Sequence, residues 1–236
     1  MTREYRLDLT GRHKLIVGEG ESDRNFFAEF CWRNSIEGFD YGFAGMHNPK
    51  YRPSGFDRFT EFLVTLHRLS GFNTLTDLVL VHDSTDEPDR RLNQLRRQIR
   101  DANRALGDQV YTEDPNPNVV SNAGRPRLHV LRIPVTARGG LESICFIVAR
   151  ESLDNSGHNG TEKEGWVDRF ANSACVGWTT EKRDKLRLQA LISAAWEKKP
   201  EMHFSQLFDI TGDQLVPLDG SAFEQIRNFL QTVATL

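Results

Sequence analysis

Residues 13–30 read HKLIVGEGESDRNFFAEF, and this stretch decides the fold. Residues 15–17 form a short apolar run rich in β-branched side chains, which predicts a buried strand. Gly18 and Gly20 then mark a tight turn, and Ser22 is a natural N-cap for a following helix. Behind it, apolar side chains repeat at helical spacing: Phe26, Phe27, Phe30 and Cys31. The stretch therefore predicts a strand, a tight turn and a helix.

Three carboxylates crowd this turn, namely Glu19, Glu21 and Asp23. Like charges at such close spacing repel each other, and a divalent cation that prefers carboxylate oxygens is the simplest reason to gather them. Glu21 and Asp23 also suit the positive end of the predicted helix, and we favour this capping role for Glu21. Glu19 precedes the helix at the end of the strand, so we predict that it belongs to a site.

Composition limits the classes of protein that need to be considered. A chain of 236 residues with 38% hydrophobic content can bury a sizeable core in one domain with an appendage. The net charge of -3 gives no overall basic field, so nucleic-acid binding would need a local patch. Cys31, Cys145 and Cys175 are far apart in apolar surroundings, which predicts reduced core residues. We find no signal peptide or membrane span and expect a cytoplasmic protein without a membrane partner.

A second apolar segment also ends in acids. Residues 77–82 read DLVLVH, and residues 83–88 continue as DSTDEP. Open parallel sheets place their sites at the carboxyl ends of the strands, so Asp83 is a strong candidate. Asp86 is a second candidate or a helix cap. Glu142, in the first turn of another predicted helix, either completes a metal site at this edge or simply faces the helix dipole.

The remaining segments alternate between strand-like and helix-like patterns. Further strands are predicted at residues 5–9, 39–44 and 128–135, and helices at residues 59–69, 89–106, 166–176, 183–196 and 223–233, with another beginning near residue 141. Residues 154–164 are predicted to form a flexible link, and the last third of the chain a helical appendage packed on the sheet. We expect an α/β fold with a mostly parallel sheet flanked by helices, divided into residues 1–152 and 153–236.

The predicted helix at residues 89–106 carries arginines opposite its apolar face. The arginines on that side are Arg90, Arg97, Arg100 and Arg104. A charged, solvated helix face is the more ordinary interpretation, and binding to a phosphate backbone is the alternative.

Two of these segments resemble a known family. The run LIVGEGESD, followed later by LVLVHDSTDE, resembles the Toprim domain, a Rossmann-like metal-binding module of topoisomerases, primases and nucleases. The EGxSD form resembles the nuclease branch related to the overcoming-lysogenization-defect (OLD) proteins. The later segments GGLES and DKLRLQALIS are similar to small stand-alone bacterial Toprim proteins. The Toprim resemblance covers residues 14–150, and the stand-alone resemblance nearly the whole chain.

The resemblance assigns roles to individual residues. Glu19 matches the Toprim glutamate and Asp83 the first aspartate of its DxD motif. Asp23 matches the extra acid of the nuclease branch, and Glu142 the acid of its LE element. The chain departs from the pattern at the second DxD position, where Thr85 stands. Threonine is a weaker, uncharged ligand, so either the neighbouring Asp86 replaces it or one metal site is damaged.

The resemblance implies a metal-dependent nuclease of DNA or RNA. Glu19 and Asp83 would be catalytic and, with Asp86 or Asp23, would hold one or two Mg²⁺ or Mn²⁺ ions that activate water for in-line attack. Phage defence is the implied setting. An ATPase partner would be a separate protein, because the chain has no GxxxxGK[ST] loop. The sequence leaves open whether the chain forms a homo-oligomer.

Two other classes of function compete with this interpretation. Gly18, Gly20 and the later Asp40 partly match a dinucleotide-binding fingerprint, but Asp23 replaces its third glycine and three acids would repel a pyrophosphate. The other class is a non-catalytic Toprim-fold subunit that regulates or binds a partner, and Thr85 favours it.

Overall fold

A computed structural model of the chain describes residues 9, 13–46, 55–135, 138–195 and 216–236. The predicted strand at residues 5–9 lies almost entirely outside these residues. The strands are β1 (Lys14–Gly18), β2 (Phe39–Phe43), β3 (Asp77–Asp83) and β4 (Arg127–Ile133). The α-helices are α1 (Glu21–Arg33), α2 (Phe59–His67), α3 (Pro88–Leu106), α4 (Leu141–Asn155), α5 (Gly160–Ala174), α6 (Thr180–Ala195) and α7 (Glu224–Ala234).

The four strands form one parallel sheet with the order β2-β1-β3-β4. β1 pairs in parallel with β2 on one side and with β3 on the other, and Lys14 stands opposite Phe39 and Asp77. The amide of Arg127, at the start of β4, donates to the carbonyl of Thr76 just before β3. The predicted α/β fold with a parallel sheet flanked by helices is confirmed.

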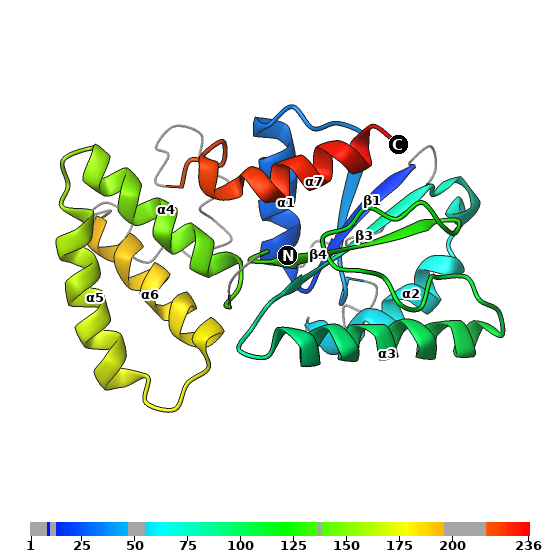
Figure 1. The fold of residues 1–236 in the computed structure, drawn as a ribbon, viewed down its shortest axis with the longest axis horizontal. Coiled ribbons are helices and arrows are strands. Elements are labelled where there is room, and N and C mark those ends of the chain that lie inside the picture. The colour runs from blue at the N-terminus through cyan, green and yellow to red at the C-terminus, as the bar shows by residue number, and fades with distance from the viewer. Residues whose placement is uncertain (1–8, 10–12, 47–54, 136–137, 196–215) are drawn as a thin grey trace, which may run out of the picture. The chain divides into compact units, whose positions relative to one another are not determined.

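Helices cover both faces of this sheet, because side chains of a strand alternate between its two faces. On one face the strands pack against α2 and α3, and on the other against α1 and α7 (Figure 1). Core residues on the α2 and α3 side include Leu15, Val17, Leu78, Leu80, Phe62, Leu95 and Ile99. The last helix is tied to the first strand, since Lys14 Nζ donates to the carbonyl of Val233 at 2.9 Å.

The chain divides into two compact units that interleave in sequence. The sheet unit comprises residues 1–82, 89–132 and 226–236, and the helical unit comprises residues 83–88 and 133–225. Within the helical unit, α4, α5 and α6 pack against one another. The predicted division of the chain into domains of residues 1–152 and 153–236 stays a prediction.

The prediction of a flexible link at residues 154–164 is wrong for both of its ends. Helix α4 continues to Asn155, and α5 already begins at Gly160. The Asp154 carboxylate accepts hydrogen bonds from the Thr161 amide at 2.9 Å and from the Thr161 hydroxyl at 2.7 Å. These bonds satisfy groups at the start of α5 and shorten the connection. The sequence pattern does not predict these hydrogen bonds, because they join residues on the two sides of a polar run that contains glycine.

Two predictions drawn from composition can be compared with the described residues. All three cysteines are buried and form no disulfide. Among the described helices, none combines the length and apolar character that crossing a bilayer requires.

Candidate functional site

The turn between β1 and α1 holds Glu19 and Asp23. The Asp23 carboxylate accepts a hydrogen bond from the Gly20 amide, with 2.8 Å between Oδ2 and N. The prediction that Ser22 caps the helix is therefore wrong, because Gly20 is the N-cap of α1. A Cβ on Gly18 would lie 2.2 Å from the Asp23 Cβ, so the turn requires glycine there. Asp23 also occupies an amide at the helix start, where a dinucleotide pyrophosphate would need donors, which argues against that alternative.

Glu19 is paired with Arg91, which was not among the predicted site residues. Arg91 Nη2 donates to Glu19 Oε2 at 2.8 Å, and the two side chains are 22% and 16% exposed. The Arg91 guanidinium carbon also lies 3.5 Å from the centre of the Phe56 ring. A signal existed in the sequence, since Arg91 shares the helix face of Leu95, where a charged residue interrupts the apolar stripe.

Asp83 ends β3 and meets the start of α4. Its Oδ1 accepts a hydrogen bond from the Leu141 amide at 3.1 Å. A Cβ on Gly140 would lie 2.7 Å from the Asp83 carboxylate carbon, so the close approach requires glycine. The positive end of the helix dipole stabilises a negative charge at this position. Asp83 therefore contacts the beginning of the helix that also contains Glu142.

Thr85 occupies the second position of the DxD pattern, and Asp86 follows it. Thr85 has a left-handed backbone, with φ of 54°, and its amide donates to the Gly139 carbonyl at 2.7 Å. Asp86 accepts a hydrogen bond from the Thr180 amide at 3.1 Å, so it caps α6. Hydrogen bonds from the side chain and backbone of Thr180 lower the pKa of Asp86. Sequence spacing could not show this, because Thr180 lies far along the chain.

Glu142 is buried at the start of α4 and has a basic neighbour from α6. Lys185 Nζ lies 3.5 Å from Glu142 Oε1. Next to this pair, the Ser143 hydroxyl donates to Asp184 Oδ2 at 2.5 Å. No site residue was predicted on α6, because the pairing of these two helices is a tertiary feature.

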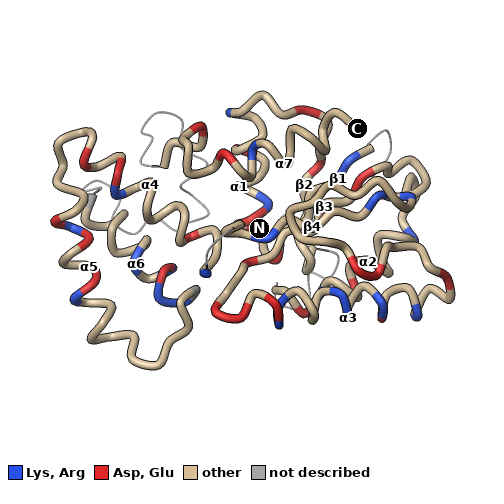
Figure 2. The backbone as a smooth tube through the Cα atoms, viewed as in Figure 1, with Lys and Arg blue, Asp and Glu red and all other residues tan. Residues whose placement is uncertain are grey.

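The arginine-rich face of α3 is present in the structure. Figure 2 shows basic residues along this helix, and the opposite face is buried at Leu92, Leu95, Ile99 and Ala102. Arg90 and Arg97 are exposed. Arg100 lies 3.4 Å from Asp114 and Arg104 lies 3.0 Å from Asp101, so carboxylates already accompany these two arginines. Contact of this face with nucleic acid stays a prediction.

The two strongest candidates follow neighbouring parallel strands. Glu19 comes directly after β1, and Asp83 is the last residue of β3. Glu19 belongs to the sheet unit and Asp83 to the helical unit, together with Asp86 and Glu142. The sharing of one cation by Glu19 and Asp83 stays a prediction.

Comparison with known families identifies the chain at the level of its family. Residues 12–235 match the profile of the family described as "Protein of unknown function (DUF3226)". The chain belongs to this family. Comparisons with curated proteins and with solved structures gave no match. The DUF3226 match covers both compact units, and the Toprim resemblance stays a prediction beside it.

The chemistry of the predicted ligands fits a hard divalent cation, because Glu19, Asp23, Asp83, Asp86 and Glu142 all offer carboxylate oxygens. Within the described part of the chain, no group of three or more His, Cys, Asp or Glu side chains is arranged to hold a metal ion. Mg²⁺, however, commonly keeps several waters and binds one or two carboxylates together with substrate phosphates. Asp23, Asp83 and Asp86 each accept a hydrogen bond from a backbone amide at a helix start, and Glu19 accepts one from Arg91.

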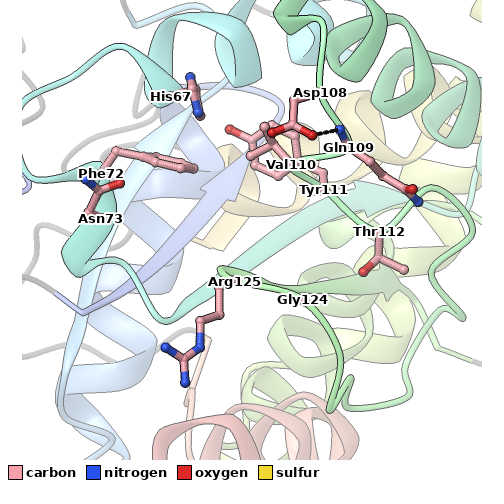
Figure 3. A pocket seen from close by; sticks show the side chains of 10 residues that line it. All are labelled: His67, Phe72, Asn73, Asp108, Gln109, Val110, Tyr111, Thr112, Gly124 and Arg125. Atoms are coloured by element: carbon pink, nitrogen blue, oxygen red, sulfur yellow. Dashed lines mark hydrogen bonds between the residues drawn. The ribbon is translucent and has the colours of Figure 1, made fainter.

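A pocket of about 480 Å³ lies elsewhere in the sheet unit. Figure 3 shows His67, Phe72, Tyr111 and Arg125 among its lining residues. These residues come from α2 and from segments before β3 and β4, at the opposite end of the strands from Glu19. None of the predicted site residues lines this pocket.

Proposed function

We propose that this chain hydrolyses phosphodiester bonds of DNA or RNA with the help of Mg²⁺ or Mn²⁺. The observation that carries the proposal is the position of Glu19 and Asp83 at the carboxyl ends of the neighbouring parallel strands β1 and β3. Ligands of open parallel sheets bind at that edge. The Toprim resemblance independently assigns catalysis to the same two residues, and it supports phage defence as the setting.

In this proposal the acids hold the cation and the basic residues hold the nucleic acid. Glu19 and Asp83 are the main ligands, and Asp23, Asp86 or Glu142 is the additional one. When bound, the cation lowers the pKa of a water molecule and offsets the charge that develops on the phosphate. The arginines of α3 hold flanking phosphates of the substrate: Arg90, Arg97, Arg100 and Arg104.

The test compares two glutamates of the same turn. Glu19→Gln removes a ligand charge with little change in volume, and Glu21→Gln is the matched control, because Glu21 is exposed. Labelled single- and double-stranded DNA and RNA are incubated with each protein and Mg²⁺ or Mn²⁺, with and without EDTA. We expect EDTA-sensitive cleavage that falls about 100-fold or more in Glu19→Gln and stays near wild type in Glu21→Gln. Cleavage that survives in Glu19→Gln, or that is unaffected by EDTA, would contradict the proposal.

The second candidate function is a catalytically impaired subunit that works with a partner such as an ATPase. The specific observation in its favour is Thr85, which occupies the second DxD position and bonds to Gly139 through its backbone. Thr85→Asp tests this directly, since aspartate tolerates a left-handed backbone better than threonine does. A rise in cleavage of about 10-fold or more in this variant would identify a damaged metal site. A wild-type protein that already cleaves efficiently, with no gain in Thr85→Asp, would exclude impairment.

A further inference from the structure

The Arg91 side chain lies between a carboxylate and an aromatic ring, all within the sheet unit. Its Nη2 donates to Glu19 Oε2 at 2.8 Å, and its guanidinium carbon lies 3.5 Å from the centre of the Phe56 ring. Phe56 is buried. The Arg91 Nε is buried as well and has no hydrogen-bond partner among the described residues. A guanidinium that rests on an aromatic face keeps its edge donors directed at an anion, which here is Glu19.

This arrangement places the positive charge of Arg91 beside Glu19, where a metal ion bound to Glu19 would also place its positive charge. The Glu19 oxygen that accepts from Arg91 cannot offer the same lone pair to a cation. A divalent ion bound to Glu19 would also lie within a few ångströms of the guanidinium, and like charges at that range repel strongly in a partly buried site. Arg91 and a metal ion therefore oppose each other at this carboxylate, and each lowers the affinity for the other.

We propose that Arg91 and the divalent cation compete for Glu19, and that the displaced Arg91 binds a phosphate of the nucleic-acid substrate. The inference rests on the proposed function, since it takes Glu19 as a metal ligand. A guanidinium matches two phosphate oxygens at once, so the substrate offers Arg91 a new anion when the metal takes Glu19. Metal binding and substrate binding thereby favour each other, because the substrate removes the competitor of the metal.

Metal affinity is measured on the full chain by titrating Mn²⁺ and following the electron paramagnetic resonance signal of the free ion. Arg91→Met keeps an unbranched side chain against Phe56 but removes the charge, and Arg91→Lys keeps the charge. Arg68→Met is the matched control, because Arg68 is exposed at the end of α2 and has no part in the proposed site. We expect Arg91→Met to bind Mn²⁺ about 5–10-fold more tightly than wild type, and Arg68→Met to bind it equally well. Arg91→Lys should fall between wild type and Arg91→Met.

Cleavage should move in the opposite direction to metal affinity. Arg91→Met is expected to cleave about 10-fold or more slowly at saturating Mn²⁺, because a phosphate contact is lost. An unchanged or weaker Mn²⁺ affinity in Arg91→Met would overturn the competition, and wild-type cleavage at saturating Mn²⁺ would overturn the phosphate contact. Arg91→Gln serves for both measurements where Arg91→Met does not fold. A wild type that binds Mn²⁺ but cleaves nothing would defeat the proposed function, while the affinity comparison would still decide the competition.

Discussion

Two carboxylates at opposite ends of the sheet are each paired with an arginine, but the pairs differ in kind. At the amino end of β3, Asp77 receives Arg127 Nε at 2.8 Å on one oxygen and Nη2 at 2.8 Å on the other. His129 Nε2 adds a third contact at 2.9 Å. At the carboxyl end of β1, Arg91 donates to Glu19 Oε2 through Nη2 at 2.8 Å.

The contacts of Asp77 with Arg127 and His129 stabilise the fold. Asp77 is 0% exposed, and burial by itself raises the pKa of a carboxyl group. Hydrogen bonds from His129, Arg127 and Thr76 outweigh this effect and hold the pKa of Asp77 well below its ordinary range. The Ser121 amide donates to His129 Nδ1, which assigns the remaining ring proton to Nε2 and ties the loop before β4 to Asp77.

The difference indicates which acids are structural and which are available for chemistry. An acid that is buried and bonded by several groups is fixed, because any new partner must break a complete set of contacts. Glu19 and its partner Arg91 are both partly exposed, whereas Asp77 is fully buried, so a cation can reach Glu19 at lower cost.

The largest expected effect follows removal of the Asp77 charge. Asp77→Asn would leave Arg127 buried in part without its anion, and we expect a loss of about 3–5 kcal/mol in the free energy of unfolding. Urea denaturation measures it. Asp89→Asn, at an exposed position in the first turn of α3, is the control and should cost less than about 1 kcal/mol. A loss below about 1 kcal/mol in Asp77→Asn would remove the distinction between the two pairs.

Acid should reproduce part of the same loss in the wild type. Because the pKa of Asp77 is lower in the folded state than in the unfolded chain, its contribution is complete above the unfolded value, near pH 4. The contribution falls as the pH drops below that value towards the folded pKa. We therefore expect the difference in unfolding free energy between wild type and Asp77→Asn to shrink below about pH 4. A constant difference from pH 6 to pH 3 would show that Asp77 is not held as predicted.

A smaller effect is expected from crowding the turn that carries Glu19. In Gly18→Ala the new Cβ would lie 2.2 Å from the Asp23 Cβ, so the turn must shift, at a cost of about 1–3 kcal/mol. Gly165→Ala is the matched control, because no atom lies within 4 Å of its added Cβ. Alanine in the α5 helix should stabilise the protein by about 0.5–1 kcal/mol. Thermal unfolding distinguishes the two, and a stable Gly18→Ala variant would argue against a rigid turn.

The smallest effect on stability is expected at the Glu19 pair itself. Arg91→Met should change the free energy of unfolding by less than about 1 kcal/mol, since a single, partly exposed ion pair contributes little and the methionine still packs on Phe56. Urea denaturation of Arg91→Met and Asp77→Asn under the same conditions compares their losses in unfolding free energy. A loss as large as that of Asp77→Asn would make the Glu19 pair structural too.

Much of the fold could be predicted from local pattern. The apolar runs that became β1 and β3 were recognised because a strand buried on both faces is apolar at nearly every position. The two faces of α3 were recognised because their period is that of a helix. Helix caps were predicted less well, since Gly20 and not Ser22 caps α1 and Asp86 caps α6.

By itself, the sequence determined the order of strands and helices and placed Glu19 and Asp83 after apolar strands, because hydrophobic period and turn residues act over a few positions. Only the tertiary structure decided which charges meet. Arg91 reaches Glu19 and Arg127 reaches Asp77 across 72 and 50 residues of chain, and such contacts depend on how helices and strands pack. Periodicity carries no information about partners at that separation, because it records only which face of an element is buried.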